Sequence, residues 1–283
     1  MPFSDGCDIL VYGTMGDIGA QVAGSLRSHN LQVVQEDFPQ NKFRDEWGYR
    51  RKLFKCIDSF NPRYIFPIGN LTAASRVKPL LPQGIMMPVA DERTIATLDN
   101  KTSCSKLAAD CDVPQPRMFA SPRDAEGYQV IFKRDQSFGG SGVHRPRNMQ
   151  ALENLVRREE GRPCLIEEFI EGTDWSVDAL RWTRGSGIYF RAGCYRSLAN
   201  HWMGPSTERV AADFPLLEQY ARAILDKIDY QGVCGMDFRV DTQGNAWFLE
   251  CNPRFTGGVG IQIESGFDIP YLLYQAVNAE DAA

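Results

Sequence analysis

The order of strand-like and helix-like segments changes near residue 90, and this change limits the folds that the chain can adopt. Before it, apolar runs at residues 8–12, 31–37 and 63–68 predict short strands, and a helical pattern follows each of them. Strands that alternate with helices favour βαβ units and a parallel sheet. After residue 90 most segments are strand-like, which indicates antiparallel pairing. We therefore predict an α/β region followed by an α+β region with antiparallel sheets.

The α+β region begins with a predicted helix over residues 93–112. Four strand-like segments follow it: YQVIFKRD, PCLIEEFIEG, DWSVDALRW and GIYFRAGCYRS. A helical pattern over residues 213–229 then precedes two further strands, GVCGMDFRVD and NAWFLECNP. The polar stretch at residues 199–213 is broken by Gly and Pro, so we expect a surface loop there.

Composition places the chain among ordinary globular proteins, because its 283 residues are 43% hydrophobic and 24% charged. The net charge of −5 argues against a nucleic-acid surface, since such surfaces are usually basic. No stretch approaches the roughly 18 apolar residues of a membrane span, and the N-terminus lacks a signal-peptide pattern. Eight cysteines form no CxxC pair, which suggests reduced thiols in a cytoplasmic protein.

Two acidic residues lie in neighbouring strand-like segments near the C-terminus. The segments GMDFRVD and FLECNPR are separated by the turn signal TQGN at 242–245, so a hairpin would bring Asp237 and Glu250 together. Burying Glu250 would be costly without a cation or strong donor beside it. Because side chains alternate along a strand, we expect Glu250, Asn252 and Arg254 to share one face. Trp247 and Leu249 would then hold the opposite face.

This group of oxygen ligands indicates a metal site. Two facing carboxylates repel each other unless a divalent cation lies between them. Asp237, Glu250 and the Asn252 amide suit Mg²⁺ or Mn²⁺ better than zinc. Mg²⁺ is usually held by few carboxylates and by phosphate oxygens, so the group predicts a nucleoside triphosphate. The alternative is a pair of surface acids on an edge hairpin.

Two glycine-rich segments also suit phosphate. The turn GTMGDIG places Gly13, Gly16 and Gly19 between a strand and a helix, as in dinucleotide-binding turns, and Asp37 ends the next strand. Its spacing is GxxGxxG, and a tight βα turn is the alternative. The second segment, FKRDQSFGGSGV, has Lys133 before a run of glycines whose backbone N–H groups suit phosphate oxygens. It is not a P-loop, and a glycine-rich hairpin turn is the alternative.

In their order, these motifs resemble the ATP-grasp superfamily, and within it the carboxylate–amine ligases and members similar to the carbamoyl-phosphate-synthase large subunit. The resemblance runs from about residue 8 to 275. It implies a Rossmann-like pre-ATP-grasp domain over residues 1–92 and an ATP-grasp domain over 93–283. Within the latter, an ATP subdomain of about 113–171 is inserted between the helix at 93–112 and a metal-binding subdomain at 172–283.

The resemblance also implies roles for residues that match the family's motifs. Lys101 and Lys133 would hold phosphates, and Asp174 would hold the ribose, where glutamate is commoner. The Gly-rich loop is matched by Gly139, Gly140, Ser141 and Gly142, and the adenine-holding strand by Glu167, Glu168, Phe169 and Ile170. The metal ligands are matched by Asp237, Glu250 and Asn252. Arg254, with Lys133, would act on the reacting groups, and Arg254 would also bind the substrate. Arg191 and Arg196 lie on a strand-like segment near the expected cleft and are further candidates for binding the substrate, with a solvated strand face as the alternative.

The function implied by the resemblance is an ATP-dependent ligase with ATP and Mg²⁺ (or Mn²⁺) as cofactors. Such an enzyme activates a carboxylate as an acyl phosphate and couples it to an amine. We expect small-molecule carboxylate and amine substrates of the amino-acid or dipeptide type, no nucleic-acid or membrane partner, and a homodimer. Two alternatives stay open, namely a non-catalytic ATP-binding regulator and an NAD(P)-binding oxidoreductase that uses the GTMGDIG turn.

Overall fold

The protein folds around three β-sheets. The computed structural model describes residues 6–13, 16–38, 45–135, 140–198 and 208–281. The first sheet has three strands, the second has four and the third has five. No helix in these described ranges is long and apolar enough to cross a membrane.

The first sheet is parallel, as the alternation of strands and helices predicts. Its order is β2-β1-β3, with β1 in the centre. The strands are β1 (Ile9–Tyr12), β2 (Val33–Glu36) and β3 (Tyr64–Pro67), and the helices that connect and follow them are α1 (Asp17–Ser28), α2 (Glu46–Phe60) and α3 (Leu71–Val77). A short 3₁₀ turn over Lys78–Leu80 extends α3. Strands β1 and β3 are buried along their whole length, which explains why they read as continuous apolar runs.

The four-stranded sheet has the order β4-β7-β5-β6 and is antiparallel in each pair. Its strands are β4 (Met118–Phe119), β5 (Val130–Arg134), β6 (Val143–His144) and β7 (Cys164–Glu168). Helix α6 (Met149–Arg158) covers it, and a 3₁₀ turn over Arg123–Ala125 precedes β5. A small apolar core that includes Phe132, Leu152 and Ile166 holds this sheet and helix together.

The five-stranded sheet is antiparallel with the order β10-β9-β8-β11-β12. Its strands are β8 (Gly172–Arg184), β9 (Gly187–Ser197), β10 (Arg209–Ala211), β11 (Gly232–Asp241) and β12 (Ala246–Asn252). Helix α7 (Pro215–Lys227) packs on one face, where Val177 and Ala179 of β8 are fully buried. The other face carries the polar residues of the candidate site.

The predicted helix over residues 93–112 is in fact two helices, α4 (Glu92–Asp99) and α5 (Lys101–Ala109). The break falls at Asn100, whose backbone is extended and whose side chain accepts a hydrogen bond from the Ser103 N–H. An Asn in this position satisfies an otherwise unpaired donor at the helix start. The break therefore turns Lys101 into the first residue of a helix that packs against β12.

Two buried clusters join the parallel sheet to the five-stranded sheet. One contains Leu10 and Tyr12 of β1 together with Phe238 of β11. The other joins Val11 to Leu180 of β8 and to the C-terminal helices α8 (Val259–Glu264) and α9 (Ile269–Asp281). Because burial of apolar surface is the main favourable term in folding, these clusters fix the parallel sheet against the sheet that carries the site.

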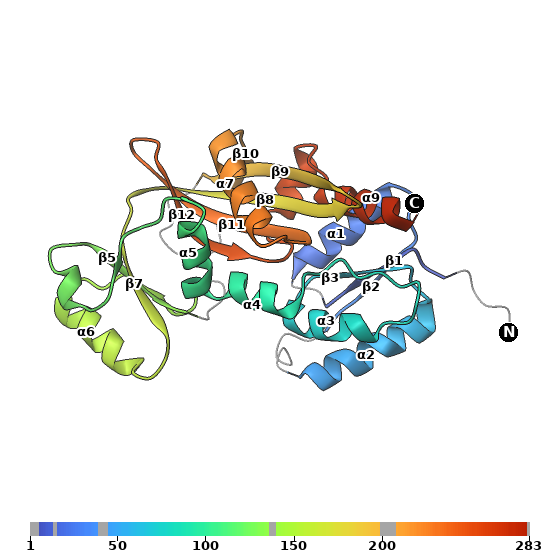
Figure 1. The fold of residues 1–283 in the computed structure, drawn as a ribbon, viewed down its shortest axis with the longest axis horizontal. Helices are drawn as coiled ribbons and strands as arrows, with labels where there is room; N and C mark the ends of the chain where they lie inside the picture. Colours follow the sequence, from blue (N-terminus) through green and yellow to red (C-terminus); the bar gives the residue numbers. More distant parts are fainter. Residues whose placement is uncertain (1–5, 14–15, 39–44, 136–139, 199–207, 282–283) are drawn as a thin grey trace.

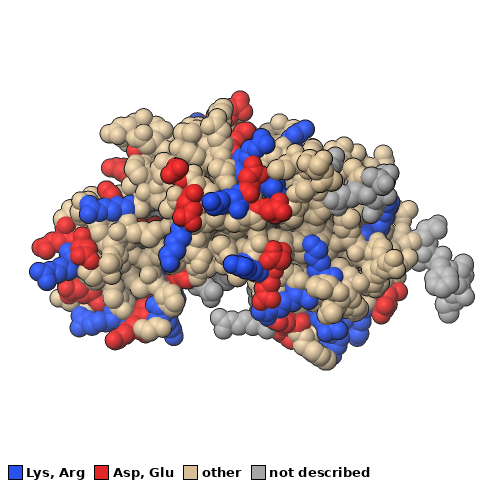
Figure 2. Space-filling view, in the orientation of Figure 1, with Lys and Arg blue, Asp and Glu red and all other residues tan. Residues whose placement is uncertain are grey.

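The arrangement is elongated, with the lobe of α6, β5 and β7 at one end and the parallel sheet with α2 and α3 at the other (Figure 1). Helices α4 and α5 lie between these ends, below the five-stranded sheet in this view (Figure 1). On the face shown in Figure 2, Lys and Arg side chains are interspersed with Asp and Glu, and neither sign forms one continuous patch there. The eight cysteines are unpaired, and five of them are buried.

Candidate active site

The hairpin predicted from the sequence is present and brings the two acids together. Strands β11 and β12 pair antiparallel, and Asp237 lies directly opposite Glu250. The Ser176 hydroxyl donates to Asp237 Oδ1 at 2.6 Å, and the Asn252 amide donates to Asp237 Oδ2 at 3.4 Å. Directly paired residues share a face of the sheet, so the side chains of Ser176, Glu250 and Asn252 gather around Asp237.

The charges at this hairpin are poorly balanced. Burial raises the pKa of the Asp237 carboxyl above its ordinary value, and the facing Glu250 carboxylate raises it further. A divalent cation between the two acids would remove this repulsion, and two carboxylates with one amide are a donor set that Mg²⁺ accepts. Among the described residues, no group of three or more His, Cys, Asp or Glu could hold a metal ion, so a metal here would rely on the amide and on outside oxygens.

The expected placement of Trp247 and Leu249 is wrong, because β12 contains a bulge. Phe238 pairs with Phe248 while Asp237 pairs with Glu250, so Leu249 is an extra residue in the strand. The core face is therefore held by Phe248 and then Cys251, and Trp247 shares the face of Glu250. Bulges of this kind shift the alternation of side chains by one residue.

Lys101 extends from the start of α5 to this hairpin. Its Nζ lies 3.2 Å from Glu250 Oε2, and its side chain is only 8% exposed. Glu250 itself is 36% exposed, so the acid is less buried than the apolar run around it suggests. The structure thus brings the first of the two predicted phosphate-binding lysines to the predicted metal hairpin.

Asp135 fastens the start of α5 to the end of β5. Its carboxylate accepts from the Thr102 N–H at 2.8 Å and from the Thr102 hydroxyl at 2.9 Å, and the Asn100 amide also donates to it. Asp135 is 5% exposed and lies two residues after Lys133. An acid at a helix N-terminus also interacts favourably with the helix dipole. This contact therefore links the segments that carry Lys101 and Lys133.

Lys133 and Glu167 form a buried ion pair between β5 and β7. Lys133 Nζ lies 2.6 Å from Glu167 Oε2, and both side chains are about one-tenth exposed or less. In the described part of the Gly-rich segment, Gly140 and Gly142 have positive φ angles of 78° and 80°. The Arg134 N–H donates to Gly142 O, and the Val143 N–H to Gly140 O. Gly139 lies outside the described residues.

The predicted adenine-holding segment connects the two antiparallel sheets. Glu167 and Glu168 end β7, and Phe169 and Ile170 lie in the short connection to β8. The Glu168 and Phe169 N–H groups donate to backbone carbonyls of neighbouring segments at 2.8 Å. The Arg145 guanidinium lies 3.6 Å from the centre of the Phe169 ring.

Asp174, the predicted ribose ligand, is paired with an arginine that sequence reasoning did not select. Arg239 Nη1 lies 2.7 Å from Asp174 Oδ1, and the two residues are direct partners across β8 and β11. Arg239 is buried and Asp174 is one-third exposed. Along the same face of β8, Ser176 comes next and contacts Asp237. The predicted ribose and metal positions therefore follow one another along one strand.

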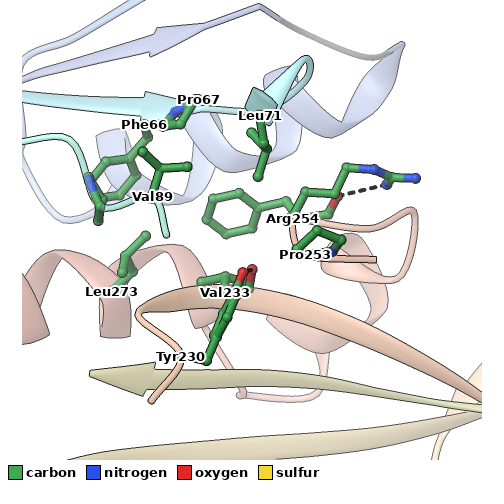
Figure 3. Close-up of a pocket in the computed structure, with 11 residues that line it drawn as sticks. Phe66, Pro67, Leu71, Val89, Tyr230, Val233, Pro253, Arg254 and Leu273 are labelled. Atoms are coloured by element: carbon green, nitrogen blue, oxygen red, sulfur yellow. Dashed lines mark hydrogen bonds between the residues drawn. The ribbon is translucent and has the colours of Figure 1, made fainter. Parts of the chain in front are cut away.

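Arg254 lies just beyond the end of β12 and folds back onto it. Its guanidinium donates to Asn252 Oδ1 at 3.0 Å and to Phe255 O at 3.2 Å. Its side chain also borders a small apolar cavity between β3 and β11, with Phe66, Leu71, Val89 and Val233 among the lining residues (Figure 3). The cavity has room for about one water molecule, and the guanidinium points away from it (Figure 3).

The other two predicted substrate arginines are not brought to this group. Arg196 pairs with Trp175 and Val210, so it lies on the α7 face of the sheet, opposite to Asp237. Arg191 is exposed and lies farther along β9, where it donates to Phe190 O at 2.8 Å. Of the three arginines, the structure places Arg254 alone beside a predicted metal ligand.

Comparisons with known proteins agree with this geometry. A family model described as "ATP-grasp in the biosynthetic pathway with Ter operon" matches residues 160–283. The chain is 20% identical over 279 residues to the carbamoyl phosphate synthase large chain of Thermoanaerobacter sp. (strain X514), an alignment that covers 91% of this chain and 26% of that protein. The chain thus spans about a quarter of the length of this relative.

Solved structures show the same fold. The biotin carboxylase domain of Hydrogenobacter thermophilus 2-oxoglutarate carboxylase, described in complex with MgADP, ADP and bicarbonate, superimposes with a TM-score of 0.73 at 17% identity, over 96% of this chain and 70% of that one. The L-amino acid ligase of Bacillus licheniformis gives 0.73 at 16% identity, over 98% and 77%. Residues 160–283 are therefore similar to an ATP-grasp family, and the chain shares the fold of these solved structures.

Several polar residues near this group were missed by the sequence reasoning. Asp99 ends α4, and burial raises its pKa while the nearby charges of Arg254 and Lys101 oppose the rise. Asp178 lies four residues after Asp174, and Arg209 begins β10. Asp99 precedes Lys101 by two residues, and Asp178 lies an even number of residues after Asp174 and so shares its face of the strand. Both residues could therefore have been selected from the sequence. Arg209 could not be selected in this way, because its position depends on the pairing of β10 with β9.

Proposed function

We propose that the chain is an ATP-dependent ligase that activates a carboxylate as an acyl phosphate and couples it to an amine. One observation carries the proposal: Asp237 and Glu250 face each other on a hairpin, and Lys101 contacts Glu250. A lysine beside paired acids suits a metal-bound phosphate, because the lysine and the metal ion would both offset the charge of the anion. The similarity of residues 160–283 to an ATP-grasp family, and of the chain to a carbamoyl phosphate synthase large chain, supports the same function.

The nucleotide would lie along the strip from the β7–β8 connection to the hairpin. In this proposal Lys101, Lys133 and the Gly-rich turn hold the phosphates, Asp174 holds the ribose, and the backbone of residues 167–170 holds the adenine. The metal ligands would be Asp237, Glu250 and Asn252. The bound Mg²⁺ would neutralise phosphate charge in the transition state. The complexes of similar folds with MgADP support ATP and Mg²⁺ as cofactors.

The chemistry proceeds in two displacements. A substrate carboxylate oxygen attacks the γ-phosphorus, an O–P bond forms, the bond to the β,γ-bridging oxygen breaks, and ADP leaves. An amine nitrogen then attacks the acyl carbon, a C–N bond forms, the C–O bond to phosphate breaks, and a proton passes to solvent. A carboxylate is already ionised at neutral pH and needs no base for the first step. Lys133 and Arg254 would offset the crowding of negative charge between the reacting groups.

The substrate class we propose is a small amino acid or dipeptide-type acid with a small amine. The support is the fold shared with an L-amino acid ligase and the position of Arg254 next to Asn252, where a guanidinium suits a carboxylate. Arg196 has no part in this proposal, because the sheet register places it on the opposite face from Asp237. Arg191 pairs with Leu180, beyond Asp178 along β8, and is not used in the proposal.

We further assign residues 1–92 to a Rossmann-like domain, supported by the parallel order β2-β1-β3. The ATP subdomain would comprise about residues 113–171, which include the four-stranded sheet, and the metal-binding subdomain residues 172–283. A homodimer stays a prediction, as does the cytoplasmic location. The biotin carboxylase domain with a similar fold is described as a dimer.

The test is a screen of paired carboxylates and amines for ADP release with Mg²⁺ and ATP, followed by mass analysis of the products. The expected result is ADP release that needs both an acid and an amine and yields a product lighter by one water than their sum. Binding of MgATP without ADP release for any pair would favour a non-catalytic regulator. Failure to bind MgATP, together with binding of a nicotinamide nucleotide, would overturn the proposal.

A further inference from the structure

Asp178 is a buried carboxylate that the proposed chemistry does not use. It lies in the middle of β8 on the same face as Asp174 and Ser176, and it is 2% exposed. Oδ1 accepts a hydrogen bond from the Thr256 hydroxyl at 2.8 Å, while Oδ2 is buried with no hydrogen-bond partner in the described part of the chain. A buried carboxylate oxygen without a donor is costly, so its position calls for a functional explanation.

Thr256 connects Asp178 to the turn that follows Arg254. The Thr256 hydroxyl donates to Asp178 and also accepts from the Gly258 N–H at 3.1 Å. The Arg209 guanidinium donates to Gly257 O, the carbonyl between these two residues. Hydrogen bonds to Asp178 and from Arg209 therefore hold the turn from Arg254 to Gly258 in place.

The sequence leaves space for this contact at two glycines. A Cβ atom at Gly235, which pairs with Asp178, would lie 2.2 Å from Thr256 Cγ2 and 2.9 Å from Asp178 Oδ1. A Cβ atom at Gly258 would lie 2.3 Å from the Tyr195 ring. Any larger residue at either position would push the turn away from the sheet, so the close approach of Thr256 to Asp178 is built into the chain.

The charges of Arg209 and Arg254 both act on the Asp178 carboxyl. Burial is the largest effect on Asp178 and raises its pKa to about 6, while the charges of Arg209 and Arg254 lower it. Arg254 is thus held on one side by Asn252 and lies within the field of Asp178 on the other. A guanidinium fixed in this way is pre-organised to bind a carboxylate or phosphate.

We infer that Asp178, acting through Thr256, is a positioning residue for the substrate end of the site: it fixes the turn so that Arg254 faces the substrate anion. The inference rests on the proposed function and adds that substrate binding depends on Asp178 while nucleotide binding does not. The reason is distance along the strand, because Asp174 and Ser176 lie between Asp178 and the β7–β8 connection where the nucleotide begins.

The experiment compares Thr256→Val, Thr256→Ser and Asp178→Asn with the unmodified protein. Calorimetry first measures MgADP binding, and inorganic phosphate is then titrated into the MgADP-loaded protein as the probe of the anion site. Thr256→Val removes the hydroxyl and keeps the shape, whereas Thr256→Ser keeps the hydroxyl. Thr242→Val, at an exposed position in the β11–β12 turn, is the matched control.

We expect Thr256→Val and Asp178→Asn to weaken phosphate binding about tenfold or more, the range typical of residues that orient a ligand-binding group. MgADP affinity should change less than about twofold, and Thr256→Ser and Thr242→Val should bind phosphate as the unmodified protein does. If Asp178→Asn fails to fold, Thr256→Val carries the test alone.

Three results would overturn the inference. In the first, Thr256→Val binds phosphate as well as the unmodified protein. In the second, MgADP and phosphate affinities fall together, which indicates a general structural role. In the third, the unmodified protein binds MgADP but no phosphate. By contrast, if the unmodified protein does not bind MgADP at all, the proposed function itself fails.

Discussion

Lys101 Nζ lies 3.2 Å from Glu250 Oε2, so a lysine at the start of one helix meets an acid on a strand about 150 residues later. The contact depends on the break at Asn100, which makes Lys101 the first residue of α5. The contact places a positive charge beside the proposed metal ligands, where a phosphate would be attracted by the lysine and by the metal ion.

Replacing Glu250 by Gln keeps the shape of the side chain and removes its charge. We expect Mg²⁺-dependent ATP turnover to fall about 100-fold or more, because the metal loses one of its two acids. Circular dichroism should show an unchanged fold. Glu264→Gln, at an exposed position of α8, is the control and should keep full turnover. Unchanged turnover in Glu250→Gln would remove Glu250 from the site.

Replacing Lys133 by Met leaves Glu167 buried without its partner. We expect the free energy of unfolding to fall by about 3–5 kcal/mol, the usual cost of breaking a buried ion pair. The double variant Lys133→Met/Glu167→Leu should recover most of this loss, because no charge is left buried. MgATP binding should stay weak in both variants if Lys133 holds phosphate. Urea unfolding and nucleotide titration measure the two effects, and recovery of binding in the double variant would contradict the proposed role.

Arg239 should act on nucleotide selectivity through Asp174. Asp174→Ala removes the proposed ribose ligand, so we expect the preference for ATP over 2′-deoxyATP or 3′-deoxyATP to fall about tenfold, as for a lost hydrogen bond to a charged group. Arg239→Met should lower the same ratio less, because Asp174 remains but is no longer held. Competition binding with the three nucleotides measures the ratio. An unchanged preference in Asp174→Ala would place the ribose elsewhere.

Asp135 should affect both stability and nucleotide binding. Asp135→Ala removes the acceptor for the Thr102 N–H and hydroxyl, so we expect a loss of about 2–3 kcal/mol in the free energy of unfolding. We also expect MgATP affinity to fall, since the contact relates the positions of Lys101 and Lys133. Asp110→Ala, at the other end of α5, is the control. Equal MgATP affinity for Asp135→Ala and the unmodified protein would confine Asp135 to stability.

The raised pKa of Asp178 predicts a pH dependence of stability. Its pKa rises from 3.8 to about 6 on folding, so the folded state holds the proton more tightly. The resulting stabilisation is complete below about pH 3.8 and is lost as the pH rises through about 6. Relative to Asp178→Asn, the unmodified protein should therefore lose about 3 kcal/mol across this interval. Urea unfolding at a series of pH values measures the difference, and parallel curves for the two proteins would contradict it.

Much of the fold was predictable because its signals are local. The apolar runs of β1 and β3, the amphipathic stripe of α1 and the TQGN turn each depend on neighbours within a few residues. That turn predicted a hairpin that brings Asp237 and Glu250 close together. Their direct pairing depends on a bulge, because the register of Phe238 with Phe248 would otherwise place Leu249 opposite Asp237. The bulge at Leu249 could not be predicted in this way, because nothing in the strand itself shows that one residue is left unpaired.

The candidate site shows the same division. Lys133 and Glu167 were each selected from motifs, but their 2.6 Å contact depends on how β5 pairs with β7. Arg196 was selected because it lies on a strand near the expected cleft, yet the register of β9 with β8 turns it to the opposite face. Side chains alternate at every residue of a strand, so a shift of one position reverses the face.

By itself, the sequence determined the order of strands and helices, the hairpin that carries the two acids, and the types of side chain available for phosphate and metal. Tertiary structure alone decided which of these meet: Lys101 with Glu250, Arg239 with Asp174, and Thr256 with Asp178. The physical reason is that these contacts join segments far apart in the chain. Their geometry is set by sheet register and by the packing of α5 and of the turn after Arg254, which involve many residues at once.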